Sequence, residues 1–317
     1  TVMSADPVDP SALLIDAGTG DEREIARNRP LTRPRPGHAD LPGMLSYDLP
    51  EARPVLERAS ARETAARVAL GVLAEALLDQ VAGVGLVSHV VSVGGQRATA
   101  SVLPTPADEA ALCEASMRAL DPADNARFEA AVDAAKHAGD TIGGVAEVIA
   151  YGIPVGLGTH VSARERLDAR LAAALMSIQS VKGVEIGDGF AQAALLGSQA
   201  HDEIVHGPDG HLTRTSNHAG GIEGGTSNGS PIIARAAFKP ISTVPRALRS
   251  VDLATGEEAV GLHQRSDTCQ VVPGAVIAEA EVALILADAL FEHAGGRSVK
   301  EMRRNLEAYL SVVGERA

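Results

Sequence analysis

The sequence predicts a mixed α+β fold in which sheets are covered by helices. Segments with helical periodicity alternate loosely with short runs of β-branched residues. The connections between them are irregular and hairpins occur, so a doubly wound nucleotide-binding sheet is not expected. Aromatic residues make up 2% of the chain and tryptophan is absent. We therefore expect a core built from Ala, Val, Leu and Ile.

Each element follows from its local pattern. Apolar residues three and four positions apart predict helices, and short β-branched runs bounded by Gly, Pro or Asp predict strands. In chain order the expected elements are an extended region over 1–50 with a possible short helix at 21–28, a helix at 57–80, a strand at 86–93, helices within 104–139 broken at Asp121-Pro122, a strand at 145–155, a helix at 164–181, a strand at 232–238, a hairpin over 251–260, and helices at 276–293 and from Ser298 to about 313.

Two of these helices have a predicted core face. The residues expected to face the core are Ala65, Val68, Val72 and Leu73 in the first helix, and Leu167, Leu171, Leu175 and Ile178 in the helix at 164–181. At the start of the last helix, Ser298 and Glu301 have the spacing of a capping box.

Composition excludes several classes of protein. The 317-residue chain has a net charge of −13, which disfavours nucleic acid and anionic membranes as partners. Its apolar runs are interrupted well before the roughly 20 residues of a membrane span. Cys113 and Cys269 fit reduced thiols and match no metal motif. We expect a cytoplasmic protein.

A stiff loop, RPRPGHAD, runs from Arg33 to Asp40. Its two prolines fix the backbone, and it carries Arg33, Arg35 and His38. Such a loop can bind phosphate or carboxylate and move a proton beside it. A surface linker rich in Pro and Arg is an equally open interpretation.

Two further segments could bind an anion. In ERASARE, residues 57–63, Arg58 and Arg62 share a helix face and Ser60 lies between them. A helix start of this kind can hold an anion, although a solvated, charged first turn explains it equally well. The glycine-rich loop at 220–229 permits close approach of a ligand. It lacks a Walker or dinucleotide signature, so tight turns alone could account for it.

Two later segments carry groups suited to phosphate and proton transfer. The sequence KPIST, residues 239–243, follows a predicted strand, and its lysine and hydroxyls could clamp a phosphate. Arg265 and Asp267 would share one face of a strand. A salt bridge is the commoner explanation; an Arg that holds substrate beside an Asp that assists proton transfer is the other. His201 and His206 are five apart, which is poor for two ligands on one helix face, so no metal site is expected.

Taken together, these segments resemble the chorismate synthase family. Six stretches occur in the family's order over most of the chain. They are PLTRPRPGHAD (30–40), RPVLERASARETAARVA (53–69), IQSVKGVEIGDGF (178–190), SNHAGGIEGGTSNG (216–229), FKPISTVP (238–245) and HQRSDTC (263–269).

The resemblance implies a β-α-β sandwich and a homotetrameric lyase of aromatic amino acid biosynthesis. Family members eliminate phosphate from 5-enolpyruvylshikimate 3-phosphate by an anti-1,4 elimination, which gives chorismate and ends the shikimate pathway. The reaction causes no net redox change, yet it requires reduced FMN. NADPH is a candidate reductant of the flavin.

The resemblance also implies roles for individual residues. His38 and Asp267 would be catalytic and move protons beside the flavin. Substrate anions would be held by Arg33, Arg35, Arg62 and Arg265. The residues implied to bind FMN are Arg58, Ala59, Ser60, Gln179, Ser180, Gly224, Lys239, Pro240, Ile241, Ser242, Thr243 and Arg265.

The start of the chain departs from the family pattern. Family members open with a strand and a Gly-Glu-Ser-His-Gly segment that carries a second catalytic histidine, and the sequence contains no such segment. No linker divides the chain, so we expect a single domain over 1–317 that is N-terminally incomplete. The alternative is a truncated, non-catalytic homologue that binds flavin or phosphate, or only assembles with complete subunits.

Overall fold

The computed structural model describes residues 29–99, 102–208, 210–262 and 266–314. Two compact units can be separated: unit 1 comprises Thr1–Ala59 and Ala247–Gln264, and unit 2 comprises Ser60–Arg246 and Arg265–Ala317. The short helix expected at 21–28 lies outside the described residues. Among the helices of the described part, none is long and apolar enough to cross a membrane.

Unit 2 is built on a five-stranded antiparallel sheet with the order β2-β1-β3-β9-β4. The expected strands are confirmed as β1 (Gly85–Val93), β3 (Gly144–Tyr151) and β9 (Ile232–Phe238). Two strands of this sheet were not expected, β2 (Gln96–Arg97) and β4 (Val181–Ile186). The sequence of β4, VKGVEI, contains a glycine and two charged residues, which hid its strand character.

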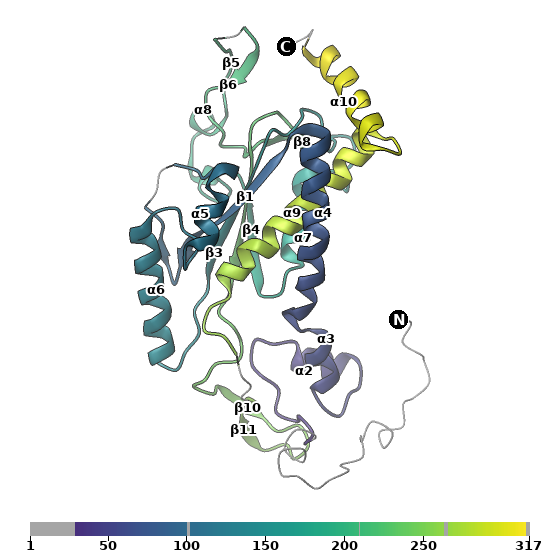
Figure 1. Cartoon of the computed structure of the whole chain (residues 1–317). Coiled ribbons are helices and arrows are strands. Elements are labelled where there is room, and N and C mark those ends of the chain that lie inside the picture. The colour runs from purple at the N-terminus through teal and green to yellow at the C-terminus, as the bar shows by residue number, and fades with distance from the viewer. Residues whose placement is uncertain (1–28, 100–101, 209, 263–265, 315–317) are drawn as a thin grey trace. The chain divides into compact units, whose positions relative to one another are not determined.

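One face of the sheet is covered by three helices, as Figure 1 shows. The long helix α9 (Val271–Ala294) packs on β1 and β3, with α4 (Thr64–Ala82) and α7 (Leu167–Met176) beside it. The predicted core face of α7 is confirmed, because its three leucines and Ile178 are all buried. Both ends of α7 lie inside the predicted 164–181. α9 begins five residues earlier than expected, at Val271.

The first helical segment differs from the prediction in two ways. It is divided into α3 (Arg53–Arg58), a 3₁₀ turn η2 (Ala61–Glu63) and α4, because Ser60 is extended and its side chain accepts a hydrogen bond from Arg62 N–H. The predicted core face is also wrong. Ala65, Val72 and Leu73 are exposed and Val68 is half-buried; the buried residues of α4 include Gly71, Ala74, Leu78 and Val81.

Small residues explain why α4 turns this face inward. A Cβ added to Gly71 would overlap the Cβ of Ala280 and lie 2.7 Å from the Ala280 Cα. The backbones of α4 and α9 therefore approach too closely for larger side chains. The prediction favoured the larger apolar residues, which cannot fit in this interface.

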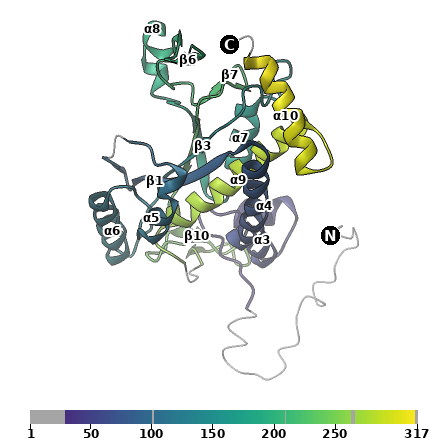
Figure 2. The same cartoon turned by 45° about the horizontal axis from the view of Figure 1, so that its top comes forward.

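The second face of the sheet is only partly apolar. Leu112 of α5 packs there against Val87, Ile149 and Ile233. Beyond this cluster, Glu147 accepts hydrogen bonds across the strands from His89, at 2.8 Å, and Arg235, at 2.5 Å. Figure 2 shows α5 and α6 beside β1, on the other side of the unit from α4.

The remaining elements of unit 2 are short or peripheral. Asp121 caps α6, which confirms the predicted break there, and Ser298 Oγ accepts from Glu301 N–H at the start of α10. The remaining elements of unit 2 are η3 (Pro106–Asp108), α5 (Glu109–Glu114), α6 (Pro122–His137), η4 (Gln192–Ala194), α8 (Gly197–Ala200), β5 (Ile204–His206), β6 (Leu212–Arg214), β7 (Ile222–Glu223), β8 (Thr226–Ser227) and α10 (Val299–Gly314).

Unit 1 contains α2 (Asp40–Ser46), α3, and the strands β10 (Arg249–Val251) and β11 (Glu258–Val260). The hairpin expected over 251–260 is confirmed, and its turn includes Gly256 at φ 75°. The extended region predicted up to residue 50 is wrong over α2. Its sequence, DLPGMLS, contains Pro and Gly, but both lie in the first turn, where they are tolerated.

Two carboxylates bind one guanidinium in unit 2. Arg118 Nη2 donates to both oxygens of Glu109 at 2.8 Å and to Glu279 at 3.2 Å. Burial raises the pKa of the nearby Glu75, and repulsion from Glu279 and Glu109 adds to this, so that its pKa reaches about 7.

We expect Gly71→Ala to destabilise the protein. Overpacking against the backbone of α9 costs about 1–3 kcal/mol, and the better helix propensity of alanine returns only about 1 kcal/mol. Thermal unfolding should show a midpoint lowered by several degrees. Gly314→Ala, at the open end of α10 with no neighbour near the added carbon, is the matched control and should have little effect. Equal midpoints for the two variants would contradict this account of the helix interface.

We expect Glu75→Gln to become more stable than the wild type as the pH rises. A raised folded-state pKa means that the stabilisation from Glu75 is complete below its unfolded value and lost as the pH rises through about 7. The glutamine has no such loss. Because Glu75 is partly exposed, we expect a relative gain of only about 1–2 kcal/mol between about pH 5 and pH 8.

Thermal melts across this pH range test the expectation. Asp79→Asn, which changes an exposed carboxylate of the same helix, serves as the control. Stability curves for Glu75→Gln and wild type that stay parallel at every pH would show that Glu75 does not take up the proton.

Candidate active site

In unit 1, the Arg33 to Asp40 loop is organised around a buried carboxylate. Asp40 has 1% of its surface exposed and Arg35 has 6%. Arg35 donates to Asp40 through its backbone N–H at 3.0 Å, Nε at 2.8 Å and Nη2 at 3.0 Å. His38 Nδ1 lies 2.5 Å from Asp40 Oδ1, the oxygen that also accepts from Arg35 Nη2.

This arrangement fixes the charge of Asp40 and the orientation of His38. Burial alone would raise the pKa of Asp40, but hydrogen bonds from His38 and Arg35 outweigh it and hold this pKa well below its usual range. A carboxylate only accepts, so His38 gives it the Nδ1 hydrogen. The Nε2 atom of His38 lies 3.3 Å from Arg35 Nη2, which can donate to it, so in neutral His38 this nitrogen is an acceptor that can take up a proton.

The loop is also tied to the hairpin of the same unit. Ser250 Oγ donates to Pro34 O at 2.5 Å, and Leu262 N–H donates to Arg33 O at 3.3 Å. Arg33 and Arg58 have exposed side chains, and Arg58 ends α3 with Ala59 as its C-cap. Of the two arginines of this loop that were predicted to bind substrate, Arg35 forms an ion pair with Asp40, whereas Arg33 is exposed at the surface.

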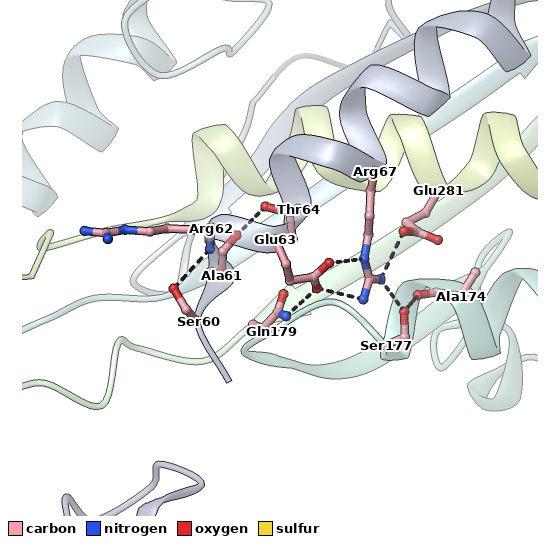
Figure 3. A network of polar contacts seen from close by, with 10 residues as sticks. All are labelled: Ser60, Ala61, Arg62, Glu63, Thr64, Arg67, Ala174, Ser177, Gln179 and Glu281. Atoms are coloured by element: carbon pink, nitrogen blue, oxygen red, sulfur yellow. Dashed lines mark hydrogen bonds and ion pairs between the residues drawn. The ribbon is translucent and has the colours of Figure 1, made fainter. Parts of the chain in front are cut away.

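In unit 2, the start of α4 carries a polar network that reaches α7 and α9 (Figure 3). Glu63 accepts two hydrogen bonds from Arg67, at 2.8 and 3.0 Å, and one from Gln179 Nε2 at 2.6 Å. Arg67 also donates to Ser177 at 2.7 Å and Glu281 at 3.0 Å. The side chain of Arg62 points away from this network and is exposed.

The residue after Gln179 joins this network to the predicted phosphate clamp. Ser180 has a φ of 70°, which is unusual and strained for a residue other than glycine, and its carbonyl accepts from Lys239 N–H at 2.9 Å. Burial lowers the pKa of Lys239, and the charge of Lys182 lowers it further. Residues 239–243 form the turn after β9, where Ile241 O accepts from Thr141 Oγ1 at 2.7 Å and Thr243 is buried.

Three predicted site residues are not part of this group. Gly224 lies in the β7–β8 turn, and its neighbour Gly225 bonds to Leu167 N–H at the first residue of α7. Gln179 follows the opposite end of that ten-residue helix, which is about 15 Å long. Asp267 is exposed, between the hairpin segment and α9. Arg265 lies outside the described residues.

Unit 2 therefore brings together Gln179, Ser180 and Lys239, with Ser60 three residues before Glu63 in the chain, while Arg35 and His38 meet in unit 1. Sequence reasoning assigned no role to several residues that organise these groups: Asp40, Glu63, Arg67, Lys182 and Glu281. Asp40 could have been noticed two positions after His38, and Glu63 four positions before Arg67. Within the described residues, no group of three His, Cys, Asp or Glu side chains is placed to hold a metal ion.

We expect Asp40→Asn to loosen unit 1 around α2. The variant leaves the Arg35 guanidinium buried without its counter-charge, which costs about 3–5 kcal/mol. Hydrogen exchange of the α2 amides, followed by mass spectrometry, should be faster at neutral pH. Since the folded pKa of Asp40 is lowered, its contribution is complete above the unfolded value of about 4 and declines at lower pH, so the difference from wild type should shrink there. Unchanged α2 exchange at neutral pH would contradict this role.

The chain is similar to known chorismate synthases. The family model for chorismate synthase matches residues 13–291. The chorismate synthase of Beutenbergia cavernae is 59% identical over 316 residues, covering 99% of this chain and 78% of the relative. That of Mycobacteroides abscessus is 56% identical over 316 residues, covering 100% of this chain and 74% of the relative.

Structural comparison agrees with the sequence matches. A solved structure titled as a crystal structure of chorismate synthase aligns with a TM-score of 0.73 at 37% identity, covering 87% of this chain and 77% of that chain. This confirms the expected α+β fold. The chain belongs to the chorismate synthase family, whose members are lyases of aromatic amino acid biosynthesis.

Proposed function

We propose that this chain eliminates phosphate from 5-enolpyruvylshikimate 3-phosphate by an anti-1,4 elimination that gives chorismate and requires reduced FMN. The observation that carries the proposal is the His38–Asp40 pair, at 2.5 Å, in a chain of this family. A histidine oriented by a buried carboxylate is suited to proton transfer beside a bound substrate.

Arginines account for the binding of an anionic substrate. Arg33 and Arg62 have exposed guanidiniums, and with Arg265 they would contact the phosphate and carboxylates. Arg35 donates to Asp40, so we propose that it supports this binding by fixing the loop in addition to any direct contact. Guanidiniums suit this task because each can donate two parallel hydrogen bonds to an anion.

The polar groups of unit 2 fit a phosphorylated flavin. Burial lowers the pKa of Lys239 and the charge of Lys182 lowers it further, and a bound phosphate would offset both effects. Ser242 and Thr243 would supply hydroxyls from the same turn as Lys239, and Ser60, Gln179 and Ser180 would line the rest of the site. The family resemblance alone adds Arg58 and Ala59 of unit 1 to the residues that contact FMN.

The remaining assigned groups would each have a separate role in the reaction. Reduced FMN would supply the electron density that assists the departure of phosphate. His38 would hold a proton at Nε2, and Asp267 would assist removal of the substrate proton. Gly224 lies at the other end of α7 from Gln179, so its proposed contact with FMN rests on the family resemblance.

Further proposals rest on the family resemblance as well. They are a single domain over 1–317, a homotetramer, a cytoplasmic location and NADPH as reductant of the flavin. The alternative remains a non-catalytic homologue that binds flavin or phosphate, or only assembles with complete subunits.

The proposed function predicts chorismate formation and phosphate release when the purified chain receives chemically reduced FMN and substrate without oxygen. His38→Ala and Asp267→Asn should lower turnover by about 10²–10⁴-fold, with modest loss of FMN binding. His137→Ala, which removes an exposed histidine of α6, should leave turnover unchanged.

The outcomes separate the two functions. Wild-type turnover in the two site variants would exclude the assigned proton-transfer roles. Binding of reduced FMN and substrate with no phosphate release would favour the non-catalytic alternative.

A further inference from the structure

The side chain of Gln179 has an orientation that chemistry fixes. Its amide group faces Glu63 at 2.6 Å. An ionised carboxylate only accepts hydrogen bonds, so the NH₂ end of the amide must face Glu63. The carbonyl end, Oε1, must therefore face the other way.

Glu63 is itself held firmly. Both of its oxygens bind the Arg67 guanidinium. Arg67 is in turn anchored to Ser177, just after α7, and to Glu281 of α9 (Figure 3). Rotating Glu63 away from Gln179 would break a bidentate ion pair that joins three helical segments, so the acceptor for the Gln179 amide is pre-organised.

The carbonyl end of Gln179 is a buried acceptor that lacks a donor. Among the described residues, no group lies within hydrogen-bond reach of Gln179 Oε1, and this atom is inaccessible to solvent. An unsatisfied buried acceptor costs about 1–3 kcal/mol. A ligand that places an N–H or O–H group against this oxygen would remove that cost.

We propose that Glu63 is a positioning residue, which fixes Gln179 as a hydrogen-bond acceptor for an N–H or O–H group of the bound ligand. This inference rests on the proposed function in one respect, the assignment of Gln179 to the flavin site. The two ends of the ligand would then meet different groups. The anionic end would lie toward Lys182 and Lys239, and a neutral donor, such as a ring N–H or a hydroxyl, would lie against Gln179. An anionic oxygen at Gln179 would be repelled.

The first experiment tests the orientation without FMN. In protein labelled with ¹³C,¹⁵N-glutamine, the side-chain NH₂ signals of Gln179, identified by their loss in Gln179→Leu, should show slow exchange with water. Glu63→Gln should abolish this protection. Protection that survives in Glu63→Gln would overturn the positioning role, whether or not the protein binds FMN.

The second experiment measures FMN dissociation constants in a double-mutant cycle. Glu63→Gln should weaken FMN binding about tenfold, which corresponds to about 1.4 kcal/mol. The same change should have almost no further effect in a Gln179→Leu background, because Glu63 acts through Gln179. Additive losses would overturn the proposal, since they would mean that Glu63 affects binding by another route.

Glu281→Gln is the matched control. It removes the other carboxylate from Arg67 but leaves the Glu63–Gln179 bond in place. Its thermal stability should fall about as far as that of Glu63→Gln, with FMN binding changed by less than about twofold. Equal losses of FMN binding in both variants would show that only the stability of the helix junction matters.

Adding FMN to the labelled protein tests the donor directly. The side-chain carbonyl carbon of Gln179 should shift downfield as Oε1 accepts a hydrogen bond. An unshifted carbonyl at saturating FMN would exclude the proposed ligand contact. Absence of FMN binding by the wild type would instead refute the proposed cofactor, and the water-exchange experiment would still decide the role of Glu63.

Discussion

The close packing of α4 on α9 is the constraint on which the rest of unit 2 depends. With few aromatic residues in the chain, the core combines buried aliphatic side chains with close backbone approach between these two helices. Gly71 and Ala280 allow this approach, and the inner face of α9 continues it with a series of buried alanines. The same packing brings together Glu63 of η2, Gln179 of the turn after α7 and Glu281 of α9. The polar network at the candidate site is therefore a product of helix packing.

The structure divides the basic residues of an acidic chain into two groups. Arg35, Arg67 and Arg118 are each bonded to carboxylates and fix local structure. Arg33, Arg58 and Arg62 are exposed and can meet an anionic ligand. Sequence alone does not separate these groups, because a guanidinium's role depends on which carboxylates the fold brings to it.

Much of the fold could be predicted because some patterns are local. Runs of β-branched residues predicted β1, β3 and β9, and the leucine spacing predicted the buried face of α7. The inner face of α4 could not be predicted, since periodicity points to the larger residues while the interface requires the smaller ones. Within the candidate site, the motif loops could be located, but the bonds that Asp40 and Glu63 make to distant or folded-back groups depend on tertiary structure.

The contact between Gly71 and Ala280 also limits how this protein can change over time. Position 71 already has the smallest residue, so it cannot shrink to compensate for any enlargement at position 280. Glycine at 280 would not make room for alanine at 71 either, because the added Cβ would still lie 2.7 Å from the Cα of residue 280. In related sequences, glycine should therefore persist at position 71 unless the two helix backbones lie farther apart.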